Sequence, residues 1–420
     1  MNYNTETLAN GLRLIHLPSP SNVIYCGYEV GVGTRHEKAG EEGLAHFCEH
    51  LTFKGTARRR AWHIINALER VGGELNAFTN KEDTVYHSAV LKEYFPRAVE
   101  LLTDIVFHSV YPQNEVEKEV EVICDEIESY RDSPAELIYD DFENAIFRGH
   151  PLGHNILGEP ERLRTYRRED AVRFTKTHYR ADNAVFFVSG NIDFARLVKK
   201  LSALHQSPPM GKLATNGQEI ASREANAKQA VRAGYGTGGQ RIEVEKGTHQ
   251  AHVMLGGRAF DVHDVRRMPL YLLNNILGGP GMNARLNLSL RERNALVYSV
   301  ESSMVSYSDA GAWAVYFGCD PHDVEKCLKL VRKELDQMME KRLTDSQLRM
   351  AKKQIRGQIG IACDAREQFA LDFGKSFLHY GWQKDISTLF EDIEKVTAED
   401  LQQVACELFE EERITTLIYR

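Results

Sequence analysis

The two halves of the 420-residue chain repeat one order of strand-forming and helix-forming segments. In the first half, strand-like runs such as "NVIYCGYEVGVG" precede segments with helical spacing of apolar residues, and in the second half "HQAHVMLGGRAF" precedes "RMPLYLLNNILGG". Between about residues 205 and 240 the chain is rich in small, polar and turn-forming residues, which is typical of a linker. A repeated plan on this scale predicts an internal duplication.

We therefore predict an α+β protein of two similar αβ domains, each with a mostly antiparallel sheet flanked by helices. The predicted boundaries are 1–206 for the first domain, 207–240 for the linker and 241–420 for the second domain. A chain of this length exceeds one ordinary core, which also favours two domains.

Composition limits the environment and the partners of the chain. With 42% hydrophobic and 27% charged residues it resembles a globular protein, and no apolar run approaches the ~20 residues that cross a bilayer. The first residues lack the pattern of a secretion signal, and seven scattered cysteines do not suggest a disulfide framework. A formal charge of -8 argues against nucleic acid. We expect a cytoplasmic protein that binds neither nucleic acid nor membranes.

The stretch "GLAHFCEHLTFKGT" places His46, Glu49 and His50 at positions i, i+3 and i+4 of a predicted helix, so the three share one face. Two imidazoles one turn apart can hold a zinc ion, and the neighbouring carboxylate can take a proton from water. This HxxEH order is one of the zinc peptidase signatures. The alternative is an ordinary polar helix face.

In one register of the duplication, "YLLNN" of the second half aligns with "HFCEH" of the first. The metal-binding pattern is then replaced by Tyr271, Asn274 and Asn275. Only the first half is predicted to bind metal by this route.

A third ligand is expected, because catalytic zinc commonly has three protein ligands and an open position. In "NEVEKEVEVICDEIESY", Glu119 and Glu126 lie seven residues apart at the edge of an apolar stripe, from which either could reach inward. The alternative is an acidic helix flank in solvent. Cys48 and Cys124 are interpreted as small core residues.

Together these stretches resemble the inverted-zinc peptidases, the family of pitrilysin, insulin-degrading enzyme and the mitochondrial processing peptidase. "HFCEHLTFKGT" and the glutamate 76 residues after His50 carry the resemblance. "GGELNAFTNKEDTVYH", "HPLGHNILGEPE" and "GGPGMNARLNLSLRERNALVYSV" extend it over nearly the whole chain, although a proline interrupts the family's glycine-rich stretch in the last of these.

The resemblance implies a role for each matching residue. His46, His50 and Glu126 would hold one zinc ion per chain, Glu49 would act as general base, and Glu119 would support a histidine from behind. Arg291 and Tyr298 would hold the substrate and stabilise the intermediate, and the edge strand would bind an extended peptide through Asn76, Ala77 and Phe78.

The predicted function is therefore that of a zinc metalloendopeptidase acting on short or unfolded peptides. Large members of the family carry two such halves in one chain, whereas this chain corresponds to one half. The resemblance therefore implies that two chains enclose the site, and we expect a homodimer. The alternatives are a subunit of a heteromeric peptidase or core complex, and a zinc- or peptide-binding protein without catalysis.

Overall fold

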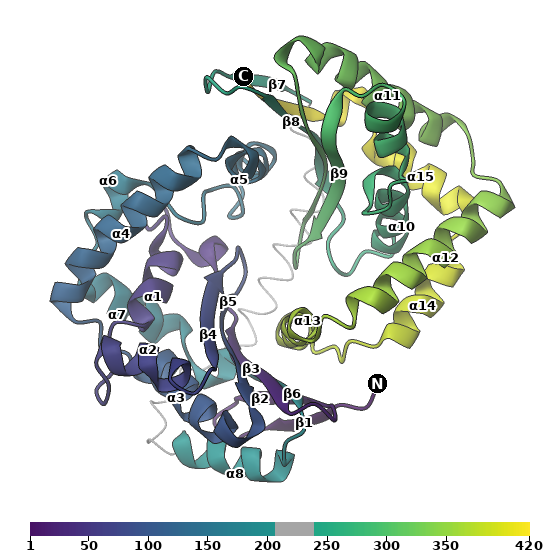
Figure 1. Ribbon diagram of the computed structural model, residues 1–420. Coiled ribbons are helices and arrows are strands. Elements are labelled where there is room, and N and C mark those ends of the chain that lie inside the picture. Colours follow the sequence, from purple (N-terminus) through teal and green to yellow (C-terminus); the bar gives the residue numbers. More distant parts are fainter. Residues whose placement is uncertain (206–238) are drawn as a thin grey trace. The chain divides into compact units, whose positions relative to one another are not determined.

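A computed structural model describes residues 1–205 and 239–420, which form two compact units. Of the described residues, the first unit draws on 1–129, 154–205 and 361–386, and the second on 130–153, 239–360 and 387–420. The predicted linker, residues 207–240, lies almost entirely outside the described residues. Each unit contains one sheet with helices (Figure 1).

The sheet of the first unit has six strands in the order β1-β2-β6-β3-β5-β4. Strand β2 is parallel to β6, and the other neighbours are antiparallel. The strands are β1 (Asn4–Thr7), β2 (Arg13–Pro18), β3 (Val23–Val30), β4 (Glu74–Thr79), β5 (Thr84–Leu91) and β6 (Ala184–Gly190). Strand β4 is therefore an edge strand, with one side free for further pairing.

Helices cover both faces of this sheet, as the fully buried strand β6 requires. Phe186 and Val188 of β6 belong to one core with most of the helices, and Val185 and Phe187 belong to a second core under α13. The helices are α1 (Leu44–Thr52), α2 (Ala61–Glu69), α3 (Phe95–His108), α4 (Gln113–Arg131), α6 (Pro160–Leu163), α7 (Arg168–His178), α8 (Phe194–Leu204) and α13 (Arg366–Tyr380).

The sheet of the second unit has the strand order β7-β11-β8-β10-β9. Its strands are β7 (Arg241–Val244), β8 (Ala251–Ala259), β9 (Val297–Ser306), β10 (Gly311–Cys319) and β11 (Thr415–Tyr419). Its helices are α5 (Pro134–Ile146), α10 (Arg267–Gly278), α11 (Val324–Glu340), α12 (Asp345–Ala362), α14 (Ile386–Lys395) and α15 (Ala398–Leu408), with a π-helical segment at Asn287–Glu292.

The two units share one topology, which confirms the predicted fold class. In both, the first strand of the shared five is parallel to the last one in sequence, the central strand leads into a helix, and an antiparallel hairpin forms the edge. Strands β2, β6, β3, β5 and β4 thus correspond to β7, β11, β8, β10 and β9. Helix α10 follows β8 as α1 follows β3, which is the arrangement that the duplication predicts.

Two helices pack in the unit formed mainly by the other half of the sequence. Helix α5, from the first half, covers β8 and β11, and α13, from the second half, covers the corresponding strands β3 and β6. Each half of the sequence therefore contributes one helix to the compact unit that is formed mainly by the other half. The sequence boundaries at 206 and 241 stay a prediction about the duplicated halves, whereas the packing units are interleaved.

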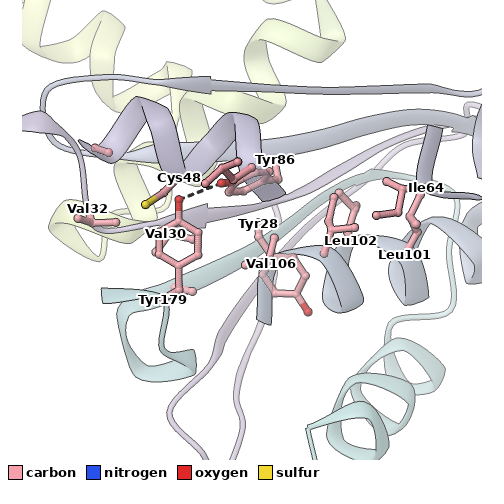
Figure 2. Packing of buried hydrophobic residues seen from close by; sticks show 14 of the residues in the cluster. Tyr28, Val30, Val32, Cys48, Ile64, Tyr86, Leu101, Leu102, Val106 and Tyr179 are labelled. Carbon is pink, nitrogen blue, oxygen red and sulfur yellow. Dashed lines mark hydrogen bonds between the residues drawn. The ribbon is translucent and has the colours of Figure 1, made fainter. Parts of the chain in front are cut away.

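The core of the first unit ties α1 to the sheet (Figure 2). The hydroxyl of Tyr86 on β5 hydrogen-bonds to Tyr179 at 2.9 Å and to Thr52 of α1 at 3.1 Å. Cys48 is fully buried and Cys124 is nearly so, as predicted for core residues. None of the described helices is long and apolar enough to span a membrane.

Candidate metal centre

Helix α1 is almost entirely buried, so its HxxEH face is not an ordinary solvent-facing polar surface. His46 and Glu49 are 7% and 6% exposed, and only His50 of the helix is partly accessible. Ionisable side chains are rarely buried without partners that satisfy them. The polar residues of α1 therefore need partners from elsewhere in the unit.

The start of α1 is fixed by a carboxylate from outside the helix. The helix begins after Gly43, whose positive φ of 86° suits glycine and which offers no side-chain cap. Instead, Glu37 accepts hydrogen bonds from the backbone nitrogens of Gly43 and Ala45 at 3.1 and 2.7 Å. His154 contacts the same carboxylate at 3.0 Å. A negative charge at a helix start is favourable, and here it sets the position of the histidine that follows.

Helix α4 supplies the two predicted acidic candidates. Its apolar stripe is buried as expected, and the acidic residues on the other side of the helix are exposed: Glu117, Glu121, Asp125 and Glu128. Glu119 is buried at 4% exposure, and the side chain of Glu126 is about one-third exposed, at 35%. Both therefore lie at the edge of the stripe.

The structure separates the two glutamates by what they contact. Oε2 of Glu126 lies 3.3 Å from Nε2 of His50 and 3.9 Å from Nε2 of His46. Oε1 of Glu119 lies 2.9 Å from Nδ1 of His50, and its other oxygen binds Lys54 at 2.6 Å. Glu126 thus completes a cluster with the two histidines, and Glu119 supports His50 from behind.

His46, His50 and Glu126 form the one group of potential metal ligands found among the described residues, with ligand atoms all within 4.8 Å of one another. A tetrahedral zinc ion with bonds of about 2.0–2.2 Å keeps its ligand atoms about 3.3–3.6 Å apart. The Glu126–His50 separation of 3.3 Å is of this size, and the Glu126–His46 separation of 3.9 Å is slightly longer. Two imidazoles and a carboxylate are also a donor set that zinc favours.

The second nitrogens of the histidines differ. Nδ1 of His50 faces Glu119, which is the carboxylate–histidine arrangement found behind many metal-bound imidazoles. Nδ1 of His46 is buried and has no hydrogen-bond partner in the described part of the chain. Nε2 of the same ring faces Glu126 at 3.9 Å and is the nitrogen that could coordinate a metal ion together with that carboxylate. The residues present therefore fit a zinc ion.

The protonation of the cluster follows from burial and from the neighbouring charges. Burial and the adjacent His50 lower the pKa of His46 to about 4, which keeps that ring neutral and able to bind metal. Burial opposes protonation of His50 too, but Glu119 and Glu126 outweigh it and raise its pKa to about 9.

Glu49 lies between His46 and His50 in the sequence and does not belong to the ligand cluster. Its Oε2 accepts a hydrogen bond of 2.7 Å from the hydroxyl of Thr79, the last residue of β4. Burial raises the pKa of Glu49 to about 7, although the Thr79 bond opposes the rise. A buried carboxyl group beside a metal site can exchange a proton near neutral pH, as a general base must.

Asn76, Ala77 and Phe78 lie on the edge strand β4, as the resemblance implies. The backbone of β4 pairs with β5 on one side, and its other side is the edge of the sheet. The side chain of Asn76 is exposed and accepts a bond from the backbone nitrogen of Ala77 at 3.0 Å. An extended peptide could add to this edge.

Arg291 and Tyr298 lie together in the second unit. Arg291 is in the π-helical segment, and its guanidinium carbon is 5.6 Å from the centre of the Tyr298 ring on β9. Tyr298 is 82% exposed, which is unusual for a large aromatic side chain. The structure thus brings this predicted pair together, with Tyr298 on the edge strand that corresponds to β4 and Arg291 in the segment that precedes it.

Three contacts of the site were not predicted from sequence: Thr79 to Glu49, Lys54 to Glu119, and Glu37 with His154 at the start of α1. The contact of Lys54 could have been predicted from sequence spacing, because Lys54 follows His50 by four residues at the end of a helix. The other contacts join segments that are far apart in the sequence, and spacing could not reveal them.

The fold and this site define a duplicated αβ protein with a two-histidine, one-glutamate metal centre in its first unit. Residues 15–160 match the family described as insulinase (peptidase family M16), and residues 165–355 match the peptidase M16 inactive domain. The chain belongs to the insulinase family, peptidase family M16.

Related chains support this assignment over most of their length. A protein named as an uncharacterized zinc protease of Bacillus subtilis is 31% identical over 98% of this chain and 97% of its own. One of Streptomyces coelicolor is 33% identical over 95% of this chain and 85% of its own. One of Rickettsia bellii is 31% identical over 99% of this chain and 97% of its own.

Two solved structures have the same fold. A crystal structure of a protease from Helicobacter pylori has a TM-score of 0.88 at 21% identity and covers 100% of this chain and 99% of its own. A peptidase M16 inactive domain from Pseudomonas fluorescens has a TM-score of 0.85 at 16% identity and covers 100% of this chain and 98% of its own. At these identities the likeness concerns the fold.

Proposed function

We propose that this protein is a zinc-dependent endopeptidase that hydrolyses short or unfolded peptides. The observation that carries the proposal is the cluster of His46, His50 and Glu126, with the buried carboxyl group of Glu49 next to it on α1. The names of the relatives, zinc proteases, agree with it. One zinc ion per chain would be held by the three residues of the cluster.

Each residue near the cluster has a task in peptide hydrolysis. Zinc, when bound there, supplies a Lewis acid that polarises a water molecule and the scissile carbonyl. Glu49 takes the proton from the attacking water and returns it to the leaving amine. Glu119 fixes the orientation of His50 by accepting from its Nδ1. Lys54 balances the charge of Glu119.

Substrate is proposed to bind as an additional strand on β4. The free edge of Asn76, Ala77 and Phe78 offers backbone donors and acceptors to an extended chain, and the same strand ends at Thr79 beside Glu49. A folded substrate would have to release a segment before it could pair in this way. Unfolded peptides should therefore be cut, and stable folded proteins should be spared.

We further propose a cytoplasmic homodimer in which each chain supplies Arg291 and Tyr298 to the zinc site of its partner, forming a closed chamber. The exposed Tyr298, stacked near Arg291, is a group suited to face a substrate or a partner. The seven cysteines, all in the described part of the chain and all free, agree with a reducing compartment.

A digest of a mixed library of unstructured peptides tests the enzyme activity. Purified protein, the same protein with chelator, and Glu49→Gln are compared by mass spectrometry. Chelator-sensitive cleavage that Glu49→Gln loses, while still holding zinc, is the expected result. Cleavage that Glu49→Gln retains would contradict the assignment of the base. Zinc binding with no cleavage in any sample would favour a binding protein or a subunit that needs a different partner.

Mixing inactive variants tests the composite site. Glu49→Gln and Tyr298→Phe are each expected to be nearly inactive, and equal amounts are allowed to exchange subunits. If sites form between chains, half of the dimers are mixed and each holds one intact site, so about a quarter of wild-type activity returns. Confirmed exchange without any recovery would show that each chain completes its own site.

A further inference from the structure

The hydroxyl of Thr79 is the hydrogen-bond partner of Glu49 within the described part of the chain. Thr79 Oγ1 donates to Glu49 Oε2 at 2.7 Å, and both side chains are buried, at 8% and 6% exposure. A hydrogen bond to a carboxylate in a buried setting is stronger than one between neutral groups. Because Oε2 is occupied in this way, Oε1 is the oxygen left for a proton.

The position of Thr79 is fixed by the turn that follows it, because each charged residue of this turn contacts another segment of the unit. The sequence "NKED" reads as an exposed polar turn, yet Lys81, Glu82 and Asp83 are 3%, 3% and 0% exposed. Lys81 donates to the backbone oxygen of His154, and Glu82 pairs with Arg35.

Asp83, the third residue of the turn, binds helix α13. Its Oδ1 lies 3.0 Å from the ammonium of Lys375 and 3.2 Å from Nε2 of His379. The end of β4 is thus fixed from three directions by separate parts of the unit. Thr79 also has a β-branched side chain with few rotamers, so its hydroxyl has a defined position.

The second unit has a related contact where no base is present. There, Asn274 of α10, which aligns with Glu49, exchanges hydrogen bonds with Ser302 of β9 at 2.9 and 2.5 Å. The link between this helix and the edge strand therefore belongs to the shared fold. In the first unit, the fold uses the link to hold an ionisable group beside a metal site.

We propose that Thr79 is a positioning residue for Glu49, which fixes the carboxylate of the base relative to the strand that binds substrate. This role rests on the proposed peptidase function. With Oε2 held at the end of β4, Oε1 is left to take the proton of an attacking water, and the base keeps its place when a peptide pairs with β4. Preorganised groups of this kind raise the rate of the chemical step more than the affinity.

Three variants test the proposal. Thr79→Val keeps the shape and removes the hydroxyl, and Thr79→Ser restores it. Thr84→Val is the matched control, because Thr84 pairs with Thr79 in the sheet, is fully buried and donates to the backbone oxygen of Val32 at 2.8 Å. For each variant, kcat and KM on an unstructured peptide, zinc content and melting temperature are measured.

We expect Thr79→Val to lower kcat by about 10- to 100-fold, with KM and zinc content unchanged. Thr79→Ser should recover most of the rate. Thr84→Val should lose a comparable amount of thermal stability yet keep kcat within about twofold of wild type. A purely structural role for Thr79 would make both valine variants behave alike, and that result would overturn the proposal. So would a serine variant no better than the valine variant.

Crystal structures of Thr79→Val and Thr84→Val decide the geometry without any turnover. The proposal expects the Glu49 carboxylate to leave its position in Thr79→Val alone, while His46, His50 and Glu126 stay in place. An unmoved Glu49 would overturn it whether or not the protein is a peptidase. Conversely, a wild-type protein without chelator-sensitive cleavage would refute the proposed function, and the structures would still show whether Thr79 positions Glu49.

Discussion

Helices α1 and α10 follow equivalent strands in two units of the same topology, but among the described residues only α1 contributes histidines to a cluster of potential metal ligands. Where α1 has His46, Glu49 and His50, the aligned positions of α10 are Tyr271, Asn274 and Asn275. Both helices are linked to an edge strand by a buried or half-buried hydrogen bond. The scaffold is thus common to both units, and the chemistry depends on a few side chains placed on it.

The comparison also shows what the scaffold alone cannot provide. The third member of the cluster, Glu126, comes from α4, and Glu119 of the same helix, paired with Lys54, contacts His50. The candidate metal cluster therefore depends on the motif, on the carboxylates of α4 and on the burial that directs them inward. This explains how the name "inactive domain" fits the second half of the chain, whose fold is otherwise alike.

The largest expected effect is the loss of the metal itself. Replacing both His46 and His50 with alanine should remove zinc and abolish hydrolysis, because a single carboxylate cannot retain the ion. Asn274→Ala with Asn275→Ala is the matched variant on α10 and should leave the zinc content unchanged. Zinc content is measured by atomic absorption on purified protein. Full zinc loading of the double histidine variant would show that α1 does not hold the metal ion, and would contradict the proposed difference between α1 and α10.

Glu49→Gln should lower kcat by about 10²- to 10⁴-fold, because an amide cannot accept the proton of the attacking water. Zinc content should stay at the wild-type level, since Glu49 is not a member of the ligand cluster. The value of kcat is measured by steady-state kinetics on one peptide, and the zinc content of the same samples is measured in parallel. A loss of zinc in proportion to activity would instead place Glu49 among the ligands.

Helices α5 and α13, each of which packs in the unit formed mainly by the other half of the sequence, offer a second comparison. Different side-chain contacts hold them. In the first unit Asp83, fully buried, binds Lys375 and His379 of α13, and in the second unit Tyr307 donates to Glu143 of α5 at 3.0 and 2.9 Å. Breaking a buried ion pair leaves a charge without its partner, whereas the tyrosine bond is exposed in part.

Asp83→Asn should therefore lower the free energy of unfolding by about 2–3 kcal/mol, a value reduced because the ammonium of Lys375 is partly accessible. Glu143→Gln should lower it by about 1 kcal/mol. Urea denaturation of both variants at pH 7 makes the comparison. Equal losses would show that the ion pairs of Asp83 and the tyrosine–carboxylate bond of Glu143 contribute equally here.

The pH dependence of the Asp83 contribution follows from its pKa. Burial alone would raise it, but Lys375 and His379 hold the pKa of Asp83 well below its usual range. A carboxyl group whose pKa is lowered by folding stabilises the protein above its unfolded-state pKa, about 3.9, and loses that contribution as the pH falls further. The difference in unfolding free energy between wild type and Asp83→Asn should be constant from pH 7 to 5 and shrink below pH 4.

The smallest effect concerns the support behind His50. Glu119→Gln should weaken zinc binding by about tenfold, because the amide supports the imidazole less strongly than the carboxylate does. Competition with a chromophoric chelator measures the affinity. Glu117→Gln, an exposed residue on the other side of α4, serves as control and should not change it. Equal affinities of the two variants would make Glu119 a structural residue only.

Much of this molecule could be predicted from local patterns. The spacing of His46, Glu49 and His50 needs only a helix to bring them together, and the period of the apolar residues in α4 places Glu119 and Glu126 at one edge. The repeated order of strands and helices also predicts the shared topology. Each of these follows from neighbours in the sequence, where the geometry of regular structure holds.

What the sequence determined by itself is thus the helix faces, the duplicated plan and the residues able to bind a metal. Only the tertiary structure decided that Glu126 faces both imidazoles while Glu119 stands behind one, that Thr79 holds Glu49, and that "NKED" is buried. Likewise, only the tertiary structure decided that α5 packs with strands of the second half of the sequence and α13 with strands of the first. These features depend on distances between segments that are far apart along the chain, and local periodicity sets directions within one element but not the packing of one element against another.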